Sequence, residues 1–311
     1  MDLALLQAQT VAPTANRETL LEAFLSAQDV KQSSRDNYRR TLRQFYAWLD
    51  RTGRSISSIS LADTIAYKED LLREGKSALT VSSYVTSLRS FYGWLEAHKL
   101  YPNIAKGLKL PKRKQQFRKQ PLTTEQTREV LNGGEGYSLR DYAILNLLLR
   151  TGLRTIEVIR ANVEDITYKA GKRVLLVHGK GREERDNFVI LTDKAYRPIE
   201  NYLRSRGKVS PKEPLFTSNS NNSRGERLTT RSISAIAKQS LRAIGLDSRE
   251  FTAHSFRHTT AVNILRAGGL LEDAQAVLRH SNPATTQIYT ATIKEEQRLK
   301  TGAEQLLDSL Y

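Results

Sequence analysis

A short basic segment divides this chain of 311 residues and limits its possible folds more than any other feature. Residues 109–120, KLPKRKQQFRKQ, contain six basic side chains and no acidic one, which makes the segment too charged to enter a core. Pro111 precludes a regular helix through it. We therefore expect an extended, solvated linker between two domains, and at about 100–200 residues per domain the chain length agrees with two.

The part before the linker, residues 16–108, carries the apolar spacing of helices. Four stretches have apolar residues at steps of three and four and are expected to be helical: residues 18–27, 33–50, 61–75 and 77–100. Ser33 and Asp36 have capping-box spacing, which predicts a helix start at Ser33. The aromatic residues lie on the apolar stripes, so we expect core residues rather than base-stacking ones. Residues 1–15 are expected to be disordered.

The part after the linker, residues 121–292, mixes helices with a little β-structure. Thr123 and Gln126 predict a capped helix start, and a strongly apolar helix should end at Gly152. Further helical stretches are expected at residues 227–245, 254–269 and after Asn282-Pro283. RVLLVH and NFVIL flank a Gly-Lys-Gly turn, which predicts a hairpin. The predicted fold class is mainly α with a small β-sheet (α+β), followed by a helical tail at residues 293–311.

The charge balance indicates a polyanionic partner. The chain has 49 Lys and Arg against 33 Asp and Glu, a formal net charge of +16, and nucleic acid is the most plausible partner for such a chain. A merely soluble basic protein remains open on charge alone. No apolar run approaches the ~18 residues of a membrane span, and the N-terminus lacks the basic region of a secretory signal. We expect a cytoplasmic, nucleoid-associated protein without a membrane partner.

The absence of cysteine excludes disulfides, thiolate-zinc sites, iron–sulfur clusters and a cysteine nucleophile. His254 and His258 have the i,i+4 spacing of a zinc-binding pair, but Ser255 stands where such a site has glutamate. No third ligand is evident, and no G-x-x-x-x-G-K-[ST] loop is present for ATP. We therefore expect no metal and no cofactor, and a structural role for His258.

The residues that carry chemistry are polar and ordered along the chain. In HSFRH, residues 254–258, His254 and Arg257 share one helix face, where imidazole and guanidinium can bind an anion and exchange a proton with it. This motif alone is weak. Upstream lies TGLR, residues 151–154, and downstream lies LRHSNPATTQIYT, which contains a histidine and a tyrosine nine residues apart.

The order Arg, Lys, His-x-x-Arg, His, Tyr resembles the tyrosine recombinase family of phage integrases and Xer-type site-specific recombinases. The resemblance covers nearly the whole chain and implies a helical SAM-like core-binding domain followed by a tyrosine recombinase catalytic domain. It implies that Tyr289 attacks a DNA phosphodiester to give a 3′-phosphotyrosyl link. The other implied catalytic residues are the phosphate ligands Arg154 and Arg257, the general acid Lys180, His254 in proton transfer, His280 as a hydrogen-bond donor to the phosphate, and Glu157 as a supporting residue.

These implied roles are chemically sound. Transfer at a phosphodiester builds negative charge on oxygens, which preorganised guanidinium groups stabilise. A phenol has a pKa of about 10, so it attacks only with a base or strong positive surroundings. A lysine at a hairpin tip could approach when DNA binds and protonate the leaving oxygen. The covalent intermediate conserves the bond energy, so no ATP is required.

Two positions depart from the family's common pattern, and the DNA-contact residues are open. Arg279 stands where the family often has glycine, which could alter the turn or add a phosphate contact, and Phe256 stands where it often has leucine. Candidate DNA-contact residues are Arg39, Arg40, Arg43, Lys112, Arg113, Lys114, Arg118 and Lys119. The first three could equally form a solvated helix face.

The resemblance also implies an assembly. We expect double-stranded DNA with an inverted-repeat site as partner, a monomer in solution and a homo-tetramer on DNA, with accessory proteins or a paralogous recombinase possible. The tail is expected to pack on a neighbouring protomer. About 16 residues precede the helical domain, which is too few for a separate arm-binding domain. Integration, excision and resolution all remain open, as do a type IB topoisomerase-like relaxing enzyme and a catalytically silent DNA-binding protein.

Overall fold

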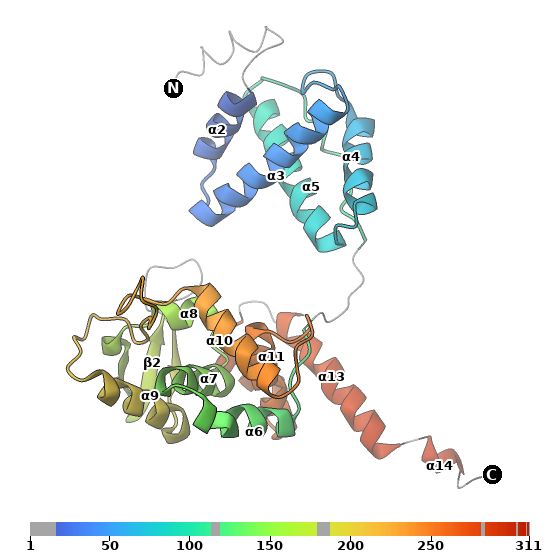
Figure 1. Cartoon of the computed structure of the whole chain (residues 1–311). Helices are drawn as coiled ribbons and strands as arrows, with labels where there is room; N and C mark the ends of the chain where they lie inside the picture. Colours follow the sequence, from blue (N-terminus) through green and yellow to red (C-terminus); the bar gives the residue numbers. More distant parts are fainter. Residues whose placement is uncertain are drawn as a thin grey trace. The chain divides into compact units, whose positions relative to one another are not determined.

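The computed structural model describes residues 17–112, 119–178, 187–280, 284–302, 304–308 and 310. The chain forms two compact units, an N-terminal unit of Met1–Gln116 and a C-terminal unit of Phe117–Tyr311 (Figure 1). The division falls inside the basic segment 109–120. The mainly helical architecture with one small sheet agrees with the predicted fold class.

The described part of the N-terminal unit contains helices α2 (Arg17–Ala27), α3 (Gln32–Arg51), α4 (Leu61–Arg73) and α5 (Ala78–Ala97). Their apolar stripes meet in one core, where Phe24, Phe45 and Phe91 are almost completely buried. Phe45 packs edge-on against Tyr67 with ring centroids 5.0 Å apart. The prediction that the aromatic residues on these stripes belong to the core is confirmed.

The predicted helix start at Ser33 is wrong. Helix α3 begins at Gln32 with Lys31 as its N-cap, so Ser33 lies inside the first turn. The Asp36 carboxylate is engaged elsewhere, because its Oδ1 accepts a hydrogen bond from Gln32 Nε2 at 2.9 Å. In contrast, the predicted capping box of Thr123 and Gln126 is confirmed at the start of α6.

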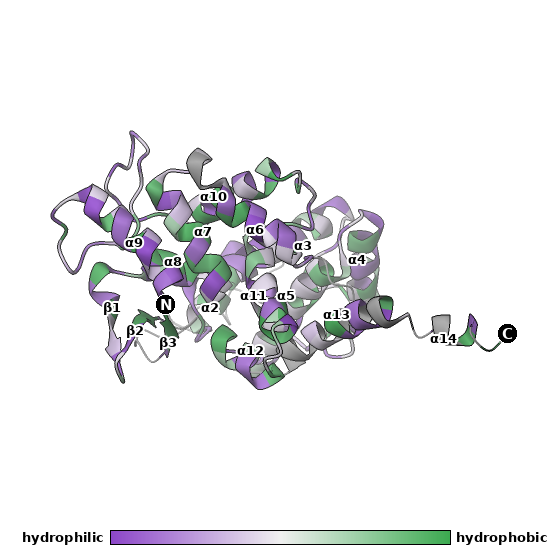
Figure 2. Cartoon of the chain, turned by 90° about the horizontal axis from the view of Figure 1, so that it is seen from below, coloured by the Kyte–Doolittle hydropathy of each residue, from purple (hydrophilic) through white to green (hydrophobic). Residues whose placement is uncertain are grey.

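The C-terminal unit surrounds a largely buried helix, α7 (Leu139–Thr151). It packs against α6 (Thr124–Asn132), α9 (Asp193–Arg206), α10 (Thr230–Ala243) and α11 (Ala253–Arg266), and lies in the middle of this unit in Figure 1. Figure 2 shows that hydrophobic residues dominate α7, whereas α9 is largely hydrophilic. The remaining elements are η1 (Gly133–Gly136), α8 (Thr155–Arg160), η2 (Val163–Asp165), α12 (Leu271–Leu278), α13 (Ala284–Thr301) and α14 (Gln305–Asp308).

A three-stranded antiparallel sheet in the order β1-β2-β3 completes the C-terminal unit. Strands β2 (Lys172–Val177) and β3 (Asn187–Ile190) pair as the predicted hairpin, with Leu175 opposite Val189. Strand β1 (Ile166–Lys169) was not expected; it precedes β2 across the tight turn at Ala170 and Gly171. The hairpin tip, residues 179–186, lies outside the described residues.

Helix α13 crosses the expected boundary between catalytic domain and tail at residues 292–293. Arg266 at the end of α11 binds the Glu296 carboxylate through Nε at 3.0 Å and Nη2 at 2.5 Å. Beyond this contact, α13 projects away from the rest of the C-terminal unit (Figure 1). Among the residues that the structure describes, no helix is both long and apolar enough to cross a membrane.

Candidate active site

Arg257 stands at the centre of the site and ties two distant turns together. It lies on the buried face of α11 and is only 2% exposed. Its Nη1 donates to the carbonyl of Gly152, two residues before Arg154, and its Nη2 donates to the carbonyl of Leu278, two residues before His280. Burial and the nearby Arg154 charge lower the pKa of Arg257 to about 9, so the guanidinium remains positive at neutral pH.

The turn after α7 depends on glycine at position 152. Gly152 ends the helix in the left-handed region with φ +61°, which favours glycine. A Cβ there would also lie 2.5 Å from Leu278 Cδ2, well inside van der Waals contact. The same position therefore needs glycine both for its backbone and for the close approach of α12.

Arg154 caps α8 and is held by the glutamate one turn later. Its backbone N–H donates to Glu157 Oε2 at 2.7 Å and its Nη1 donates to Glu157 Oε1 at 2.8 Å. The Glu157 side chain is 1% exposed, whereas that of Arg154 is 29% exposed and remains accessible to a ligand. Burial would raise the pKa of Glu157, but the charges of Arg279 and Arg154 and the hydrogen bonds from Arg154 outweigh it and lower the pKa.

Arg279 also binds Glu157. It adopts the left-handed conformation with φ +54° at the end of α12, and its Nη2 donates to Glu157 Oε2 at 2.8 Å. Replacing the family's common glycine with Arg279 does not alter the turn, because the residue still adopts a glycine-like conformation. The guanidinium binds a carboxylate of its own chain.

The nucleophile candidate Tyr289 is buried against α11. It is 2% exposed, and its hydroxyl lies 2.8 Å from His258 Nδ1. His254 precedes His258 by one turn and contacts it edge-on, with ring centroids 4.8 Å apart. The expectation that His258 is merely structural missed this contact. The signal was present, because HSFRH places both histidines on one helix face.

Burial sets the protonation states of these groups. It raises the pKa of Tyr289 to about 12, although the charges of Arg257 and Arg154 act in the opposite direction. It lowers the pKa of His258 to about 3, with His254 and Arg257 adding to the effect. It likewise lowers the pKa of His280 to about 4, together with the charges of Arg257 and Arg154. At neutral pH the phenol is therefore protonated and both imidazoles are neutral.

The structure thus brings together most of the sequence-predicted site residues. The charges of Arg154 and Arg257 act on both His280 and Tyr289, so these groups share one site. Lys180 lies outside the described residues. Within the described part of the chain, no group of three or more His, Asp and Glu side chains could hold a metal ion. Arg154, Arg257 and His280 form a group that can bind a phosphate, with the Tyr289 phenol in the same site.

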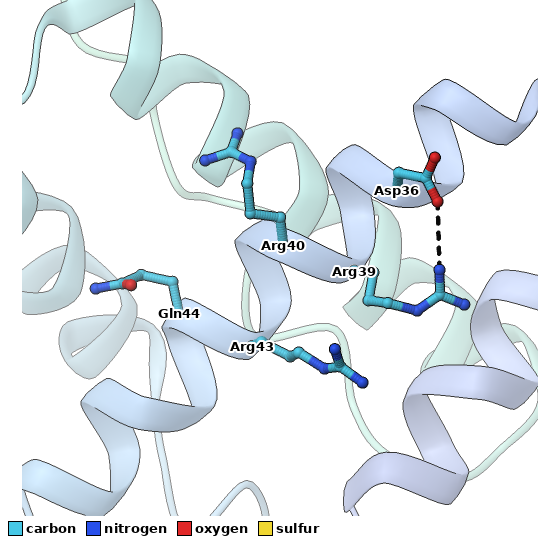
Figure 3. A pocket seen from close by; sticks show the side chains of 5 residues that line it. All are labelled: Asp36, Arg39, Arg40, Arg43 and Gln44. Carbon is cyan, nitrogen blue, oxygen red and sulfur yellow. Dashed lines mark hydrogen bonds and ion pairs between the residues drawn. The ribbon is translucent and has the colours of Figure 1, made fainter. Parts of the chain in front are cut away.

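The arginine candidates for DNA contact on α3 line a shallow pocket of about 410 Å³ together with Asp36 and Gln44 (Figure 3). Arg39 is bound to Glu22 through Nε at 3.0 Å and Nη2 at 2.9 Å, and Arg43 pairs with Glu18. Arg40 donates to the Tyr84 hydroxyl at 3.1 Å. Arg39 and Arg43 therefore already have carboxylate partners within the N-terminal unit.

The linker candidates are only partly described. Lys112 is exposed, and Lys119 Nζ donates to the carbonyl of Arg249 at 2.5 Å within the C-terminal unit. Arg113, Lys114 and Arg118 lie outside the described residues. These linker positions therefore stay predictions.

Comparison with known proteins gives consistent matches. Residues 120–296 match the phage integrase family, and residues 18–99 match the phage integrase N-terminal SAM-like domain. The chain is 34% identical over 244 residues to tyrosine recombinase XerC of Caldanaerobacter subterraneus subsp. tengcongensis, covering 76% of this chain and 65% of that protein. It is 30% identical over 294 residues to tyrosine recombinase XerD of Halalkalibacterium halodurans, covering 89% and 94%.

Solved structures share the fold. The XerH site-specific recombinase bound to palindromic difH substrate, in a post-cleavage complex, superposes with a TM-score of 0.75 at 19% identity, covering 93% of this chain and 84% of that one. A lambda integrase dimer bound to a COC′ core site gives a TM-score of 0.67 at 18% identity, covering 88% and 76%.

Proposed function

The chain belongs to the phage integrase family of tyrosine recombinases, and on that premise we propose how its side chains divide the work of cutting DNA. It is a site-specific recombinase, an enzyme that cleaves and rejoins its DNA partner through a tyrosine. The topoisomerase-like and catalytically silent alternatives are not favoured, because the relatives are recombinases.

One contact carries the assignment of the nucleophile. Of the tyrosines in the C-terminal unit, Tyr289 shares its site with two arginines, and its hydroxyl lies 2.8 Å from a neutral imidazole, that of His258. In the free protein the low pKa makes His258 a weak base, but the negative charge of a bound phosphate raises that pKa, so that the imidazole can accept the phenolic proton as the phosphorus is attacked. We assign this step to His258, with His254 in contact with its ring.

The remaining groups stabilise the phosphate. Arg154 and Arg257 neutralise the charge that develops on the non-bridging oxygens, and neutral His280 donates one N–H. Lys180, which lies between β2 and β3 in the sequence, protonates the leaving 5′-oxygen. This last role rests on the order of residue types along the chain.

The experiment uses a nicked suicide duplex, which traps the covalent protein–DNA adduct. The wild-type chain should give an SDS-stable adduct, and Tyr289→Phe should give none, because only the attacking oxygen is removed. Tyr92→Phe is the matched control: its hydroxyl is buried in the N-terminal unit without a hydrogen-bond partner among the described residues. An undiminished adduct with Tyr289→Phe rules out this nucleophile.

The assembly is proposed from the family. We expect inverted-repeat DNA sites and four protomers in the synapse from a chain that is monomeric in solution, with accessory proteins or a paralogous recombinase as further partners. Its substrate places it at the nucleoid in the cytoplasm. For the biological role, we propose recombination of a mobile element or plasmid rather than resolution of chromosome dimers.

The tail offers a test of this assembly. Leu307 at 50% exposure and Leu310 at 73% leave apolar surface on the projecting end of the chain, which a neighbouring protomer can cover. Deleting residues 302–311 keeps the Arg266–Glu296 contact and should spare adduct formation. It should slow strand exchange between two sites. Unchanged exchange contradicts the tail's action in trans, and relaxation without exchange by the wild-type chain favours the topoisomerase alternative.

A further inference from the structure

The Glu157 carboxylate is shared between two arginines. Its Oε1 accepts from Arg154 Nη1 at 2.8 Å, and its Oε2 accepts from the Arg154 backbone at 2.7 Å and from Arg279 Nη2 at 2.8 Å. The Glu157 side chain is 1% exposed, and that of Arg279 is 8% exposed. A buried carboxylate of this kind needs a partner at all times, since leaving it unpaired is costly.

The two arginines differ in what else they can reach. The Arg154 side chain is 29% exposed, and in the proposed function it binds the phosphate. Arg279 is enclosed, and its second terminal nitrogen, Nη1, donates to the Val277 carbonyl at 2.7 Å. Its Nε is buried without a hydrogen-bond partner among the described residues. Arg279 is therefore fixed on Glu157, whereas Arg154 can turn to a ligand.

The backbone points to the same conclusion. Arg279 has φ +54°, a conformation that is unfavourable for any residue with a side chain. It stands between Leu278, whose carbonyl binds Arg257, and His280. The turn thus keeps an arginine where glycine would adopt the conformation more easily, and the contact with Glu157 offsets that strain.

We propose that Arg279 is a positioning residue that neutralises Glu157 and so frees Arg154 to bind the scissile phosphate. Without it, Glu157 has Arg154 as its counterion and competes with the phosphate for that guanidinium. This inference rests on the proposed function, because it concerns the same phosphate site.

The test measures single-turnover adduct formation on the suicide duplex and, separately, the Kd for the uncleaved duplex and its salt dependence. Arg279→Ala and Arg279→Gly should cleave about tenfold more slowly. The Kd for the whole duplex and its salt dependence should change little, because many other phosphate contacts contribute to binding. Arg279→Lys should be less impaired, because an ammonium can still pair with Glu157. Adding Glu157→Gln to Arg279→Gly should restore part of the rate, since a neutral amide does not compete for Arg154.

Arg204→Ala is the control for loss of one positive charge, because Arg204 is 72% exposed on α9, where it forms a surface ion pair with Glu200 at 3.2 Å. Thermal unfolding checks that each variant folds. If Arg279→Ala and Arg279→Gly do not fold, the cleavage rate of Arg279→Lys is compared with that of the wild-type chain instead. Wild-type rates in the Arg279 variants, no recovery in the double variant, or a weaker Kd with a reduced salt slope would each overturn the inference. A wild-type chain that forms no adduct overturns the proposed function itself and the inference with it.

Discussion

At the scale of single residues, the choice of general base depends on which imidazole contacts the Tyr289 phenol. The sequence predicted the pairing of His254 and Arg257 on one helix face, and it placed His280 and Tyr289 downstream in the right order. It did not predict that His258 contacts Tyr289, because that contact depends on how α13 packs against α11. The direction of the Arg279 side chain was equally beyond sequence reasoning, since it depends on the buried position of Glu157.

Replacing the two histidines separately distinguishes their roles. His258→Ala should slow adduct formation by about 100-fold, because it removes the base beside the phenol. His254→Ala should have the smaller effect, because His254 packs against the ring of His258 and acts on the phenol through it. The measurement is the single-turnover cleavage rate of each variant at neutral pH. The reverse order of effects returns the proton-transfer role to His254.

At the scale of secondary-structure elements, strong periodicity was a good guide and short elements were not. The apolar stripes predicted α3, α5 and α7 well, and the two apolar runs around the Gly-Lys-Gly turn predicted β2 and β3. Strand β1 and helix α12 were missed because they have 4 and 8 residues, too few for a periodic pattern to emerge. Helix α9 was missed despite its 14 residues, because it is largely polar and carries Pro198 in its interior. The start of α3 was misplaced because capping-box spacing also occurs within a helix.

The turn between α7 and α8 gives a prediction at this scale. Gly152→Ala should lower the free energy of unfolding by at least about 2 kcal/mol, because it combines an unfavourable φ with a clash against Leu278. Gly245→Ala is the control: its φ is +78°, yet nothing lies within 4 Å of its added Cβ, so only the backbone cost of about 1 kcal/mol applies. Urea unfolding of both variants measures the difference. Equal losses would show that the approach of Leu278 is easily relieved.

At the scale of the whole molecule, the charge that suggested nucleic acid is unevenly available. The net charge of +16 includes arginines that already have acidic partners, such as Arg39 and Arg43 on α3. Composition counts these side chains as free cations. The structure shows that part of this charge serves the N-terminal unit itself.

The salt dependence of DNA binding tests this distinction. Replacing Lys112, Arg113 and Lys114 with glutamine should reduce the slope of log Kd against log salt by about 0.9 for each phosphate that the linker no longer neutralises. Arg43→Gln should change the slope less, because Glu18 already occupies that guanidinium. The comparison uses one duplex titrated at several salt concentrations. An equal or larger change with Arg43→Gln identifies α3, rather than the linker, as the phosphate-binding surface.

The hydrogen bonds of Arg257 bear on the stage of folding at which this enzyme becomes able to cleave DNA. They join its guanidinium to Gly152, 105 residues away in sequence, and to Leu278, 21 residues away. The turns that carry Arg154 and His280 therefore meet only after the C-terminal unit has completed its fold. A nascent or partly unfolded chain has Tyr289, but not the assembled cationic groups that we propose act on the phosphate. Competence to cut is thereby restricted to the finished protein, the form that is also able to reseal the break.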